Sequence, residues 1–549
     1  MDSSPFASRL DSNYAATDSE ALEIKALLEK PKSRLEELSI QLEKLSNEQS
    51  VLLLFVSKHR ALISPIRKLP IEILQEIFIA CLPTAHNPVM SRWESPILLT
   101  QVCSSWRSVA HATPQLWKAI HVAIPCGENF SSTTVERHID HRSEAVQEWL
   151  TRSAAYPLNI SLGRWGSSDL DEFYNKIIDT VIRFSERWKE VWFLAPYRAL
   201  VPVASLPPSK VPLLETLSFN CPPPGPAQLN FMQLNPQSVC GVLKAPNLRN
   251  LWLRGFWLTQ LEMDVTRLPI NWSQLTILVL EATSWGACFL SVSGTYRILS
   301  LCPNLITCQL EVGSISEDIE ELPLDATAAI ITLPSLTRLS VRENTSLKRL
   351  FTLLHLPSLN FIEFHTTIYP TEHSSTSLLS LLTRLHNTIH LITDQYFTRQ
   401  DFIKCLRLCP LLKSLSIRKS YGPPGAPTFK IDDAFLKLFF NSSDDEGSPL
   451  CPQLEDFESS SENEFSETTL LEFVKEKNGD STTGLAKLKH LFVLFGCRLC
   501  DISQELEPYK LAGLVATVTY QHSAPFSAFG GLPGHTLSGF GLPGYMPPY

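Results

Sequence analysis

The stretch PNLRNLWLRG, residues 246–255, decides the fold of this chain. Leu248, Leu251 and Leu253 follow the pattern Leu-x-x-Leu-x-Leu, two residues behind a proline that stops a helix and releases the chain into a strand. The pattern recurs clearly at Leu214/Leu217/Phe219, Leu275/Leu278/Leu280, Leu305/Cys308/Leu310, Leu336/Leu339/Val341, Leu359/Ile362/Phe364, Leu412/Leu415/Ile417 and Leu488/Leu491/Val493. Weaker copies are Trp188/Val191/Phe193, His386/Ile389/Leu391 and Leu454/Phe457/Ser459.

Successive copies are 23 to 42 residues apart, near or above the 20 to 29 residues that are typical of a leucine-rich repeat. Each unit reads as a helix, a proline turn and a short strand. Because no unit can bury its apolar edge alone, stacking is required to complete a continuous core. We therefore predict an α/β fold in which residues 185–510 form a leucine-rich-repeat-like solenoid with a parallel β-sheet on one face.

Strand residues between the repeated leucines should face outward and form an open surface. Such a strip is suited to binding a protein, and aromatic and arginine side chains most often anchor such contacts. Trp252, Arg338, Phe361 and Glu363 are the candidate target-binding residues.

Composition limits the other possibilities. The 549 residues are 44% hydrophobic and 19% charged, which excludes wholesale disorder, and the formal net charge of −9 gives no basic footprint for nucleic acid. Neither an export signal nor a membrane-spanning run is expected. Thirteen scattered cysteines then indicate reduced thiols in the cytoplasm or nucleus, and Cys302, Cys409 and Cys451, each directly before a repeat proline, are expected to be small buried residues.

The N-terminal region divides into a disordered segment, 1–20, and an amphipathic helix, 21–58. Leu35, Leu38, Leu42 and Leu45 step by three and four residues, although Pro31 is expected to interrupt the helix early. Two interpretations are open at this point: a self-associating coiled coil, or a helix that packs back on its own chain.

Residues 59–120 contain more apolar side chains than so short a helical segment can bury. Leu69 and Pro70 introduce a helix carrying Ile73, Ile77 and Phe78. A second apolar block, from Ile97 to Trp117, places Val102, Trp106, Val109 and Ala110 on one helical face. This surface requires either a partner protein or the rest of the same chain.

The order Leu69-Pro70-x-Glu72-Ile73, Ile77-Phe78, Val102-Cys103-x-x-Trp106-Arg107 and Leu116-Trp117 resembles the F-box motif. It is most similar to the F-box-like proteins of mushroom-forming fungi, although the connection from Thr84 to Pro96 is longer than in the commonest F-box. The resemblance implies binding to the Skp-type adaptor of a cullin ubiquitin ligase. It assigns that role to Leu69, Pro70, Ile73, Ile77, Phe78, Val102 and Trp106.

Three further segments are predicted from local composition. Residues 121–184 form a connector containing a helix at 144–153. The acidic, serine-rich stretch 441–474 is interpreted as a solvated insertion. Residues 511–549 form a flexible tail, because no charged side chain occurs from His522 onward and GLPG appears twice.

Sequence motifs for catalysis are absent: there is no phosphate-binding loop, no nucleophile elbow and no zinc-protease motif. The pairs His138/His141 and Cys497/Cys500 lack the further ligands that a metal site needs. We therefore expect no cofactor and no metal. The resemblance to F-box proteins implies a non-catalytic substrate-recognition subunit of a ubiquitin ligase. The alternatives are a ligase-independent repeat scaffold, an enzyme carried on a repeat body and a receptor-like surface protein.

Overall fold

The computed structural model describes residues 5–10, 14–124, 132–163, 171–221, 240–255, 268–281, 290–313, 329–368, 376–385, 387–419, 429–440, 448–460, 463–479, 484–497, 500 and 502–522. The chain divides into two compact units, Met1–Ile77 and Phe78–Tyr549. The acidic run 444–446 and the tail beyond residue 522 lie outside the described residues. Residues 448–460 and 463–474 of the predicted solvated insertion are described, and they contain strand β14 (Asp456–Ser459) and the start of helix α14 (Glu467–Asn478), which buries Leu470 and Phe473, so the prediction of an insertion was wrong for these residues.

The first unit consists mainly of one long helix, α1, from Asp18 to Leu62. A capping box at Thr17 and Glu20 starts it, and the Thr17 backbone N–H donates to Glu20 Oε2 at 2.9 Å. The helix starts before the predicted residue 21 and runs unbroken through Pro31, so the expected interruption was wrong. Pro31 removes one backbone hydrogen bond without ending the helix. Every residue from 25 to 60 is exposed.

Residues 59–120, here called the F-box-like segment after the resemblance noted above, contain three complete α-helices: α2 (Ile71–Ala80), α3 (Ile97–Val102) and α4 (Ser104–His111). As predicted, α2 begins directly after Pro70. The second predicted helix is in fact two helices, because Cys103 is fully extended and its Sγ accepts a hydrogen bond from the Trp106 backbone N–H at 3.4 Å. Val102 therefore ends α3 and does not share a helical face with Trp106.

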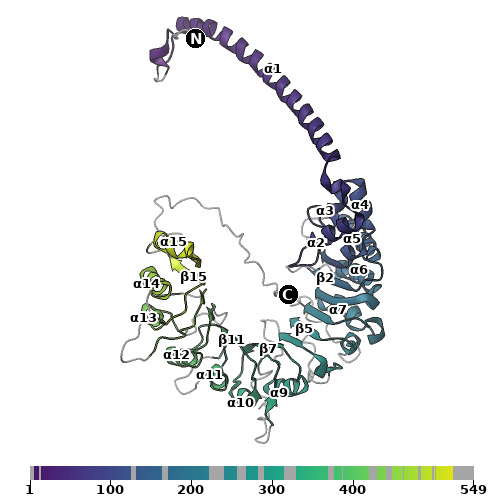
Figure 1. Cartoon of the computed structure of the whole chain (residues 1–549), viewed down its shortest axis with the longest axis vertical. Helices are drawn as coiled ribbons and strands as arrows, with labels where there is room; N and C mark the ends of the chain where they lie inside the picture. The colour runs from purple at the N-terminus through teal and green to yellow at the C-terminus, as the bar shows by residue number, and fades with distance from the viewer. Residues whose placement is uncertain are drawn as a thin grey trace. The chain divides into compact units, whose positions relative to one another are not determined.

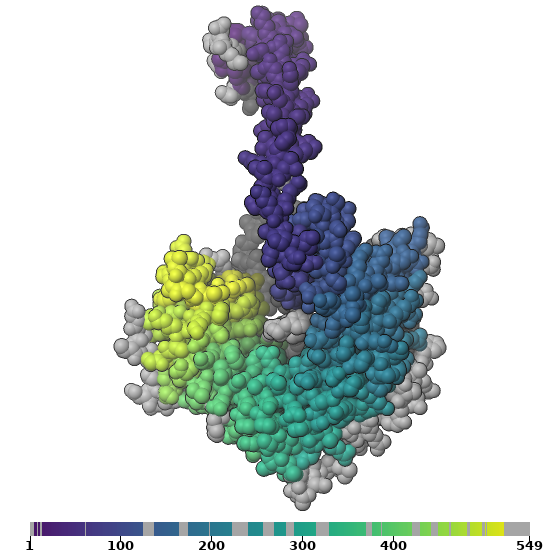
Figure 2. Space-filling view, turned by 45° about the vertical axis from the view of Figure 1, so that its right-hand side comes forward, coloured from purple at the N-terminus to yellow at the C-terminus, as the bar shows by residue number. Residues whose placement is uncertain are grey.

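A single sheet of fourteen parallel strands runs through the second unit, and its strands pair in chain order. It contains β1 (Ala119–Ala123), β2 (Leu158–Gly163), β3 (Trp188–Leu194), β4 (Thr216–Cys221), β5 (Asn250–Gly255), β6 (Ile277–Glu281), β7 (Thr307–Val312), β9 (Arg338–Glu343), β11 (Phe361–Thr366), β12 (His390–Thr393), β13 (Ser414–Ile417), β14 (Asp456–Ser459), β15 (His490–Cys497) and β16 (Val515–His522). The short strands β8 (Ile331–Thr332) and β10 (Leu354–His355) pair separately. Figure 2 shows the chain passing through this unit in sequence order, from blue to yellow.

Helices of the second unit lie on the outer side of the curved sheet, as Figure 1 shows. They are α5 (Ser132–Arg152), α6 (Asp171–Ile182), α7 (Tyr197–Ala204), α9 (Val292–Leu301), α10 (Lys348–Thr352), α11 (Ser377–Leu382), α12 (Arg399–Arg407), α13 (Asp433–Lys437), α14 (Glu467–Asn478) and α15 (Ser503–Leu511). Side-chain caps start five of them: Ser291, Thr376, Thr398, Asp432 and Ser466 each accept a backbone hydrogen bond from the first turn.

The sheet is longer than the repeat pattern predicted. Its first two strands, β1 and β2, lie before residue 185, so most of the predicted connector belongs to the sheet unit. At the other end, β16 at Val515–His522 pairs with β15 in the segment predicted to be a flexible tail. These strands were missed because Ile120, Ile160 and Val518 belong to copies of the pattern that lack the proline and the first leucine.

The core is built from the repeated leucine positions. One predicted copy, His386/Ile389/Leu391, was placed two residues too early: Leu391 aligns with Ile362 and Thr393 with Phe364, so the buried positions are Thr388, Leu391 and Thr393. Consecutive strands align one row of side chains across the sheet, which comprises Ile120, Ile160, Val191, Leu217, Leu251, Leu278, Cys308, Leu339, Ile362, Leu391, Leu415, Phe457, Leu491 and Ala516. All but the last are buried. Cys302, Cys409 and Cys451 are buried too, as predicted, and burial raises the pKa of the Cys302 and Cys409 thiols to about 12. They act as small apolar residues.

Candidate protein-binding surfaces

The open face of the sheet presents one unbroken row of side chains between the two buried rows. Register places every member beside its neighbour on the next strand. The row, here called the open-face row, is His121, Ser161, Trp192, Ser218, Trp252, Val279, Gln309, Ser340, Glu363, Ile392, Ser416, Glu458, Phe492 and Thr517. Its members are more polar than those of the buried rows, so this face is the candidate target-binding surface. Six members are nevertheless at most 8% exposed and contribute little accessible surface: Ser218, Trp252, Val279, Ser340, Ile392 and Ser416.

Trp252 does not behave as the sequence predicted. Its side chain is only 8% exposed, and its ring lies 4.6 Å from that of Trp192, the half-buried tryptophan two strands away. Ser218, on the strand between them, is small enough to let the two rings meet. Trp252 therefore belongs to a packed aromatic pair, and the prediction that it lies open to a target was wrong.

Arg338 and Phe361, by contrast, are brought together at the accessible surface. The guanidinium carbon of Arg338 lies 3.9 Å from the centre of the Phe361 ring, and the two residues are direct partners on β9 and β11. The His390 ring lies 5.8 Å beyond Phe361, on β12. A cation, a benzene ring and an imidazole thus form a three-strand stack with one exposed end at Arg338.

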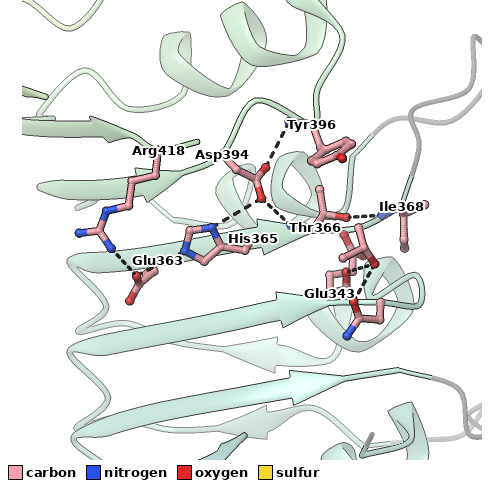
Figure 3. Close-up of polar contacts among 10 residues, drawn as sticks. Glu343, Glu363, His365, Thr366, Ile368, Asp394, Tyr396 and Arg418 are labelled. Carbon is pink, nitrogen blue, oxygen red and sulfur yellow. Dashed lines mark hydrogen bonds and ion pairs between the residues drawn. The ribbon is translucent and has the colours of Figure 1, made fainter. Parts of the chain in front are cut away.

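The fourth predicted target-binding residue, Glu363, belongs to a half-buried ionic network, drawn in Figure 3. His365 lies between two carboxylates: its Nε2 is 3.4 Å from Glu363 Oε1, and its Nδ1 is 3.5 Å from Asp394 Oδ2. Arg418 Nη1 reaches the same Glu363 oxygen at 3.2 Å. Asp394 also accepts backbone hydrogen bonds from Thr366 and Tyr396.

This network favours a protonated imidazole. Burial alone would lower the pKa of His365, but the hydrogen bonds and negative charges of Asp394 and Glu363 raise it to about 9. Burial favours the neutral form of Glu363, yet the hydrogen bond and charge of His365, with the charge of Arg418, lower the pKa of that carboxyl. The raised pKa of His365 and the lowered pKa of Glu363 agree with each other. Both describe an imidazolium held by two carboxylates.

Glu343 is a structural neighbour of this network. It is 3% exposed, and burial raises its pKa despite hydrogen bonds that favour the charged form. It accepts hydrogen bonds from the Leu347 backbone N–H at 2.9 Å and from the Ser377 hydroxyl. Glu343 therefore ties the end of β9 to the starts of α10 and α11.

Other charges on the open face pair with one another. Arg254 Nε lies 2.7 Å from Glu281 Oε2, and Arg342 Nη1 lies 3.7 Å from Glu311 Oε2. This pairing leaves a face of mixed sign. A target would be selected by shape and by the aromatic stack more than by net charge.

In the F-box-like segment the predicted adaptor-binding residues differ in accessibility. Pro70, Ile73, Ile77 and Val102 are exposed, and Leu69 is half-buried. Two further apolar side chains, Ile71 and Leu98, are 59% and 40% exposed. Sequence reasoning missed both, although Leu98 lies one helical turn before Val102.

Phe78 contradicts the prediction. It is fully buried, and its ring lies 4.8 Å from that of Trp106, which is itself half-buried. The two aromatic residues therefore pack on each other inside the second unit. Phe78 supports the fold of the segment and offers no surface to an adaptor.

The comparisons add no family assignment. No protein-family model matches the chain, and no curated protein matches its sequence. Among the described residues, no group of three metal-binding side chains converges, and no helix is long and apolar enough to cross a bilayer.

Proposed function

We propose that the chain is an F-box-like protein with a leucine-rich-repeat solenoid, and that it serves as the substrate-recognition subunit of a Skp/cullin-type ubiquitin ligase. Residues 59–117 would dock on the Skp-type adaptor, and the open face of the sheet would hold a target protein. This chain would perform no bond chemistry itself. Its contribution would be the proximity of the target to the ubiquitin-carrying enzyme, in the cytoplasm or nucleus.

One observation carries the adaptor proposal. Helix α2 begins directly after Leu69-Pro70 and exposes Ile71, Ile73 and Ile77, which are 59%, 49% and 37% accessible. Ile73 and Ile77 are four residues apart and therefore share one helical face. Exposed isoleucines on a short, well-placed helix are typical of a surface that becomes buried on binding.

For the solenoid, the support is the chain-order sheet and its buried leucine rows. Each strand adds one parallel neighbour and one layer of core, as in stacked repeats. The stack of Arg338, Phe361 and His390 then offers a target a rigid aromatic and cationic anchor on the open face.

A pull-down with purified Skp-type adaptor tests the proposal. We expect the intact chain to capture the adaptor, and Ile73→Glu, Ile77→Glu and Val102→Glu each to reduce capture by about tenfold or more, because each places a charge in an apolar contact. Leu411→Glu is the matched control, since Leu411 is 47% exposed but lies outside the F-box-like segment. Thermal melts should show that all four variants remain folded.

The outcomes separate the two leading interpretations. If the intact chain captures no adaptor, the ligase proposal fails, and the alternative of a ligase-independent scaffold takes its place. The burial of Phe78 against Trp106 is the observation that favours that alternative, because this residue of the motif already packs on its own chain and is not accessible to an adaptor. If the glutamate variants capture as much adaptor as the intact chain, the docking surface has been assigned incorrectly.

A further inference from the structure

The long helix α1 carries an exposed apolar stripe along most of its 45 residues. Because the helix continues through Pro31, the stripe extends well before Leu35. Its members recur at alternating steps of three and four residues and are Ala21, Ile24, Leu28, Pro31, Leu35, Leu38, Leu42, Leu45, Gln49, Leu52, Val56 and His59. This spacing is typical of a seam between two helices in a coiled coil.

Apolar seams of this length need a partner, because a long helix gains most of its stability from packing. Leu35, Leu42, Leu45 and Leu52 are each at least 56% exposed, and none of them is covered within the described chain. The symmetry of the seam and the charges beside it indicate which partner would cover it.

We propose that α1 pairs with α1 of a second copy of this chain, in an antiparallel coiled coil centred on Ile40. The seam repeats itself when it is read backwards from this centre, so seam residues equally far from Ile40 on either side would meet across the pair. Residues that flank the seam on the Arg34 side would pair about Gln41, one position further along the helix. The resulting layers are Leu38 with Leu42, Leu35 with Leu45, Leu28 with Leu52, Ile24 with Val56, Pro31 with Gln49 and Ala21 with His59. By two-fold symmetry each layer occurs twice.

Charges flanking the seam favour the same arrangement. In the antiparallel pair, Arg34 lies opposite Glu48 of the second copy, twice per dimer, and Leu27 lies opposite Phe55. Arg34 also pairs with Glu37 on its own helix at 2.7 Å, and a guanidinium with five donors can serve both carboxylates.

The competing arrangements lose this charge pair. In a parallel pair, Arg34 would face Ser39 and Glu48 would face Leu53. Sliding the antiparallel helices by one heptad would instead place Arg34 opposite Phe55 or Gln41. The parallel pair would bring Glu20 opposite Lys25 instead, but Glu20 already caps the helix at Thr17 and pairs with Arg9 at 2.7 Å. The pairing centred on Ile40 joins the long seam to an opposite-charge pair near its middle.

Charge exchange in the full chain tests the pairing, with mass measured by sedimentation equilibrium. We expect Arg34→Glu and Glu48→Arg each to weaken dimerisation by about tenfold, because each variant creates two like-charge contacts, and the double variant to restore it. Leu38→Glu with Leu42→Glu should abolish the dimer, and circular dichroism should show that the rest of the chain stays folded. A monomeric intact chain, or a dimer that survives this seam variant, would overturn the proposal.

Cysteine cross-linking fixes the direction. Gln41 would lie beside its own counterpart only in the antiparallel pair, so Gln41→Cys should form a covalent dimer on oxidation at well above the wild-type background. Gln49→Cys is the matched control, because Gln49 would meet its own counterpart only in a parallel pair. Cross-linking of the Gln49 variant, or equal effects of single and double charge exchange, would overturn the antiparallel arrangement. Loss of the dimer should leave adaptor capture unchanged, which keeps this proposal separate from the proposed function.

Discussion

Arg338 stacks on Phe361 across two neighbouring parallel strands, with the guanidinium carbon 3.9 Å from the ring centre. The two residues are 23 positions apart in sequence, and they meet because consecutive units align the same strand position. The contact restricts the arginine side chain in the free chain, so binding of the proposed target would cost less side-chain freedom.

We first expect this stack to contribute measurably to stability. In a double-mutant cycle of Arg338→Ala with Phe361→Ala, the coupling energy should be about 0.5–1 kcal/mol, as is usual for an exposed cation over a ring. Urea unfolding gives the free energies of unfolding of the intact chain, the two single variants and the double variant. A cycle of Arg342→Ala with Phe361→Ala is the control, because Arg342 pairs with Glu311 instead, and a coupling of equal size in both cycles would contradict the assignment.

A second prediction separates target binding from stability on the open face. Arg338→Ala and Phe361→Ala should remove the same set of neighbouring proteins from a proximity-labelling experiment in cells, with little loss of folded protein. Trp252→Ala should instead lower the free energy of unfolding by about 3 kcal/mol, because it empties a buried site beside Trp192. If the Trp252→Ala protein is as stable as the intact chain and loses the same neighbouring proteins as Arg338→Ala and Phe361→Ala, then Trp252 does contribute to target binding.

The third prediction concerns pH and His365. Since its pKa is raised to about 9 from 6.5, protonation of His365 stabilises the fold fully below about pH 6.5, and the stabilisation is lost as pH rises through about 9. Relative to His365→Gln, the intact chain should gain on the order of 2–3 kcal/mol at pH 6 and much less at pH 10. Urea unfolding at the two pH values measures the difference.

Histidine NMR checks the cause directly. The resonance assigned by its loss in His365→Gln should titrate near pH 9, and Asp394→Asn should move that midpoint to lower pH because one of the two carboxylates is gone. A midpoint near 6.5 in the intact chain would show that Glu363 and Asp394 do not hold the cation.

Phe78 and Val102 provide the fourth prediction. Phe78→Ala should lower the free energy of unfolding by about 3–5 kcal/mol, because it removes a fully buried ring from its contact with Trp106. Val102→Ala, at a 56% exposed position, should change it by less than about 0.5 kcal/mol. Thermal and urea unfolding distinguish them, and equal effects would mean that Phe78 is not part of the core.

These contrasts show what the sequence could predict. The spacing of Leu248, Leu251 and Leu253 predicted a buried row and an open row because a strand alternates sides every residue. The same spacing could not show that Trp192 and Trp252 would meet over Ser218. That contact depends on how far two side chains reach across the intervening strand, which no repeat pattern encodes.

The ionic network was hidden for a different reason. Glu363 was predicted to face outward, and His365, two residues later, follows the same alternation. Asp394 and Arg418 occupy the position of His365 in the next two units, because Phe364, Thr393 and Ile417 are aligned across three neighbouring strands. The sequence pattern placed the middle copy, His386/Ile389/Leu391, in the wrong register and so did not bring these side chains together. For Phe78, the motif indicated residue type but not whether the ring would pack on Trp106 or face a partner.

The last prediction uses a buried lysine in α14. Lys477 is 2% exposed, its Nζ donates to the Pro452 carbonyl at 3.4 Å, and burial lowers its pKa to about 8. Below that pH the lysine is protonated in both states, so folding must bury a charge. Above about pH 10.5 it is neutral in both states, and this penalty disappears.

Lys477→Met should therefore stabilise the chain at pH 7, by on the order of 1–3 kcal/mol, and the gain should shrink as pH rises from about 8 to 10.5. Lys475→Met is the matched control, because Lys475 lies on the same helix but is exposed, and its replacement should have little effect at any pH. Urea unfolding across this pH range measures the free energy of unfolding of both variants and of the intact chain. A gain that is independent of pH would come from packing alone, and a loss of stability at pH 7 would mean that the hydrogen bond to Pro452 outweighs the desolvation of the charge.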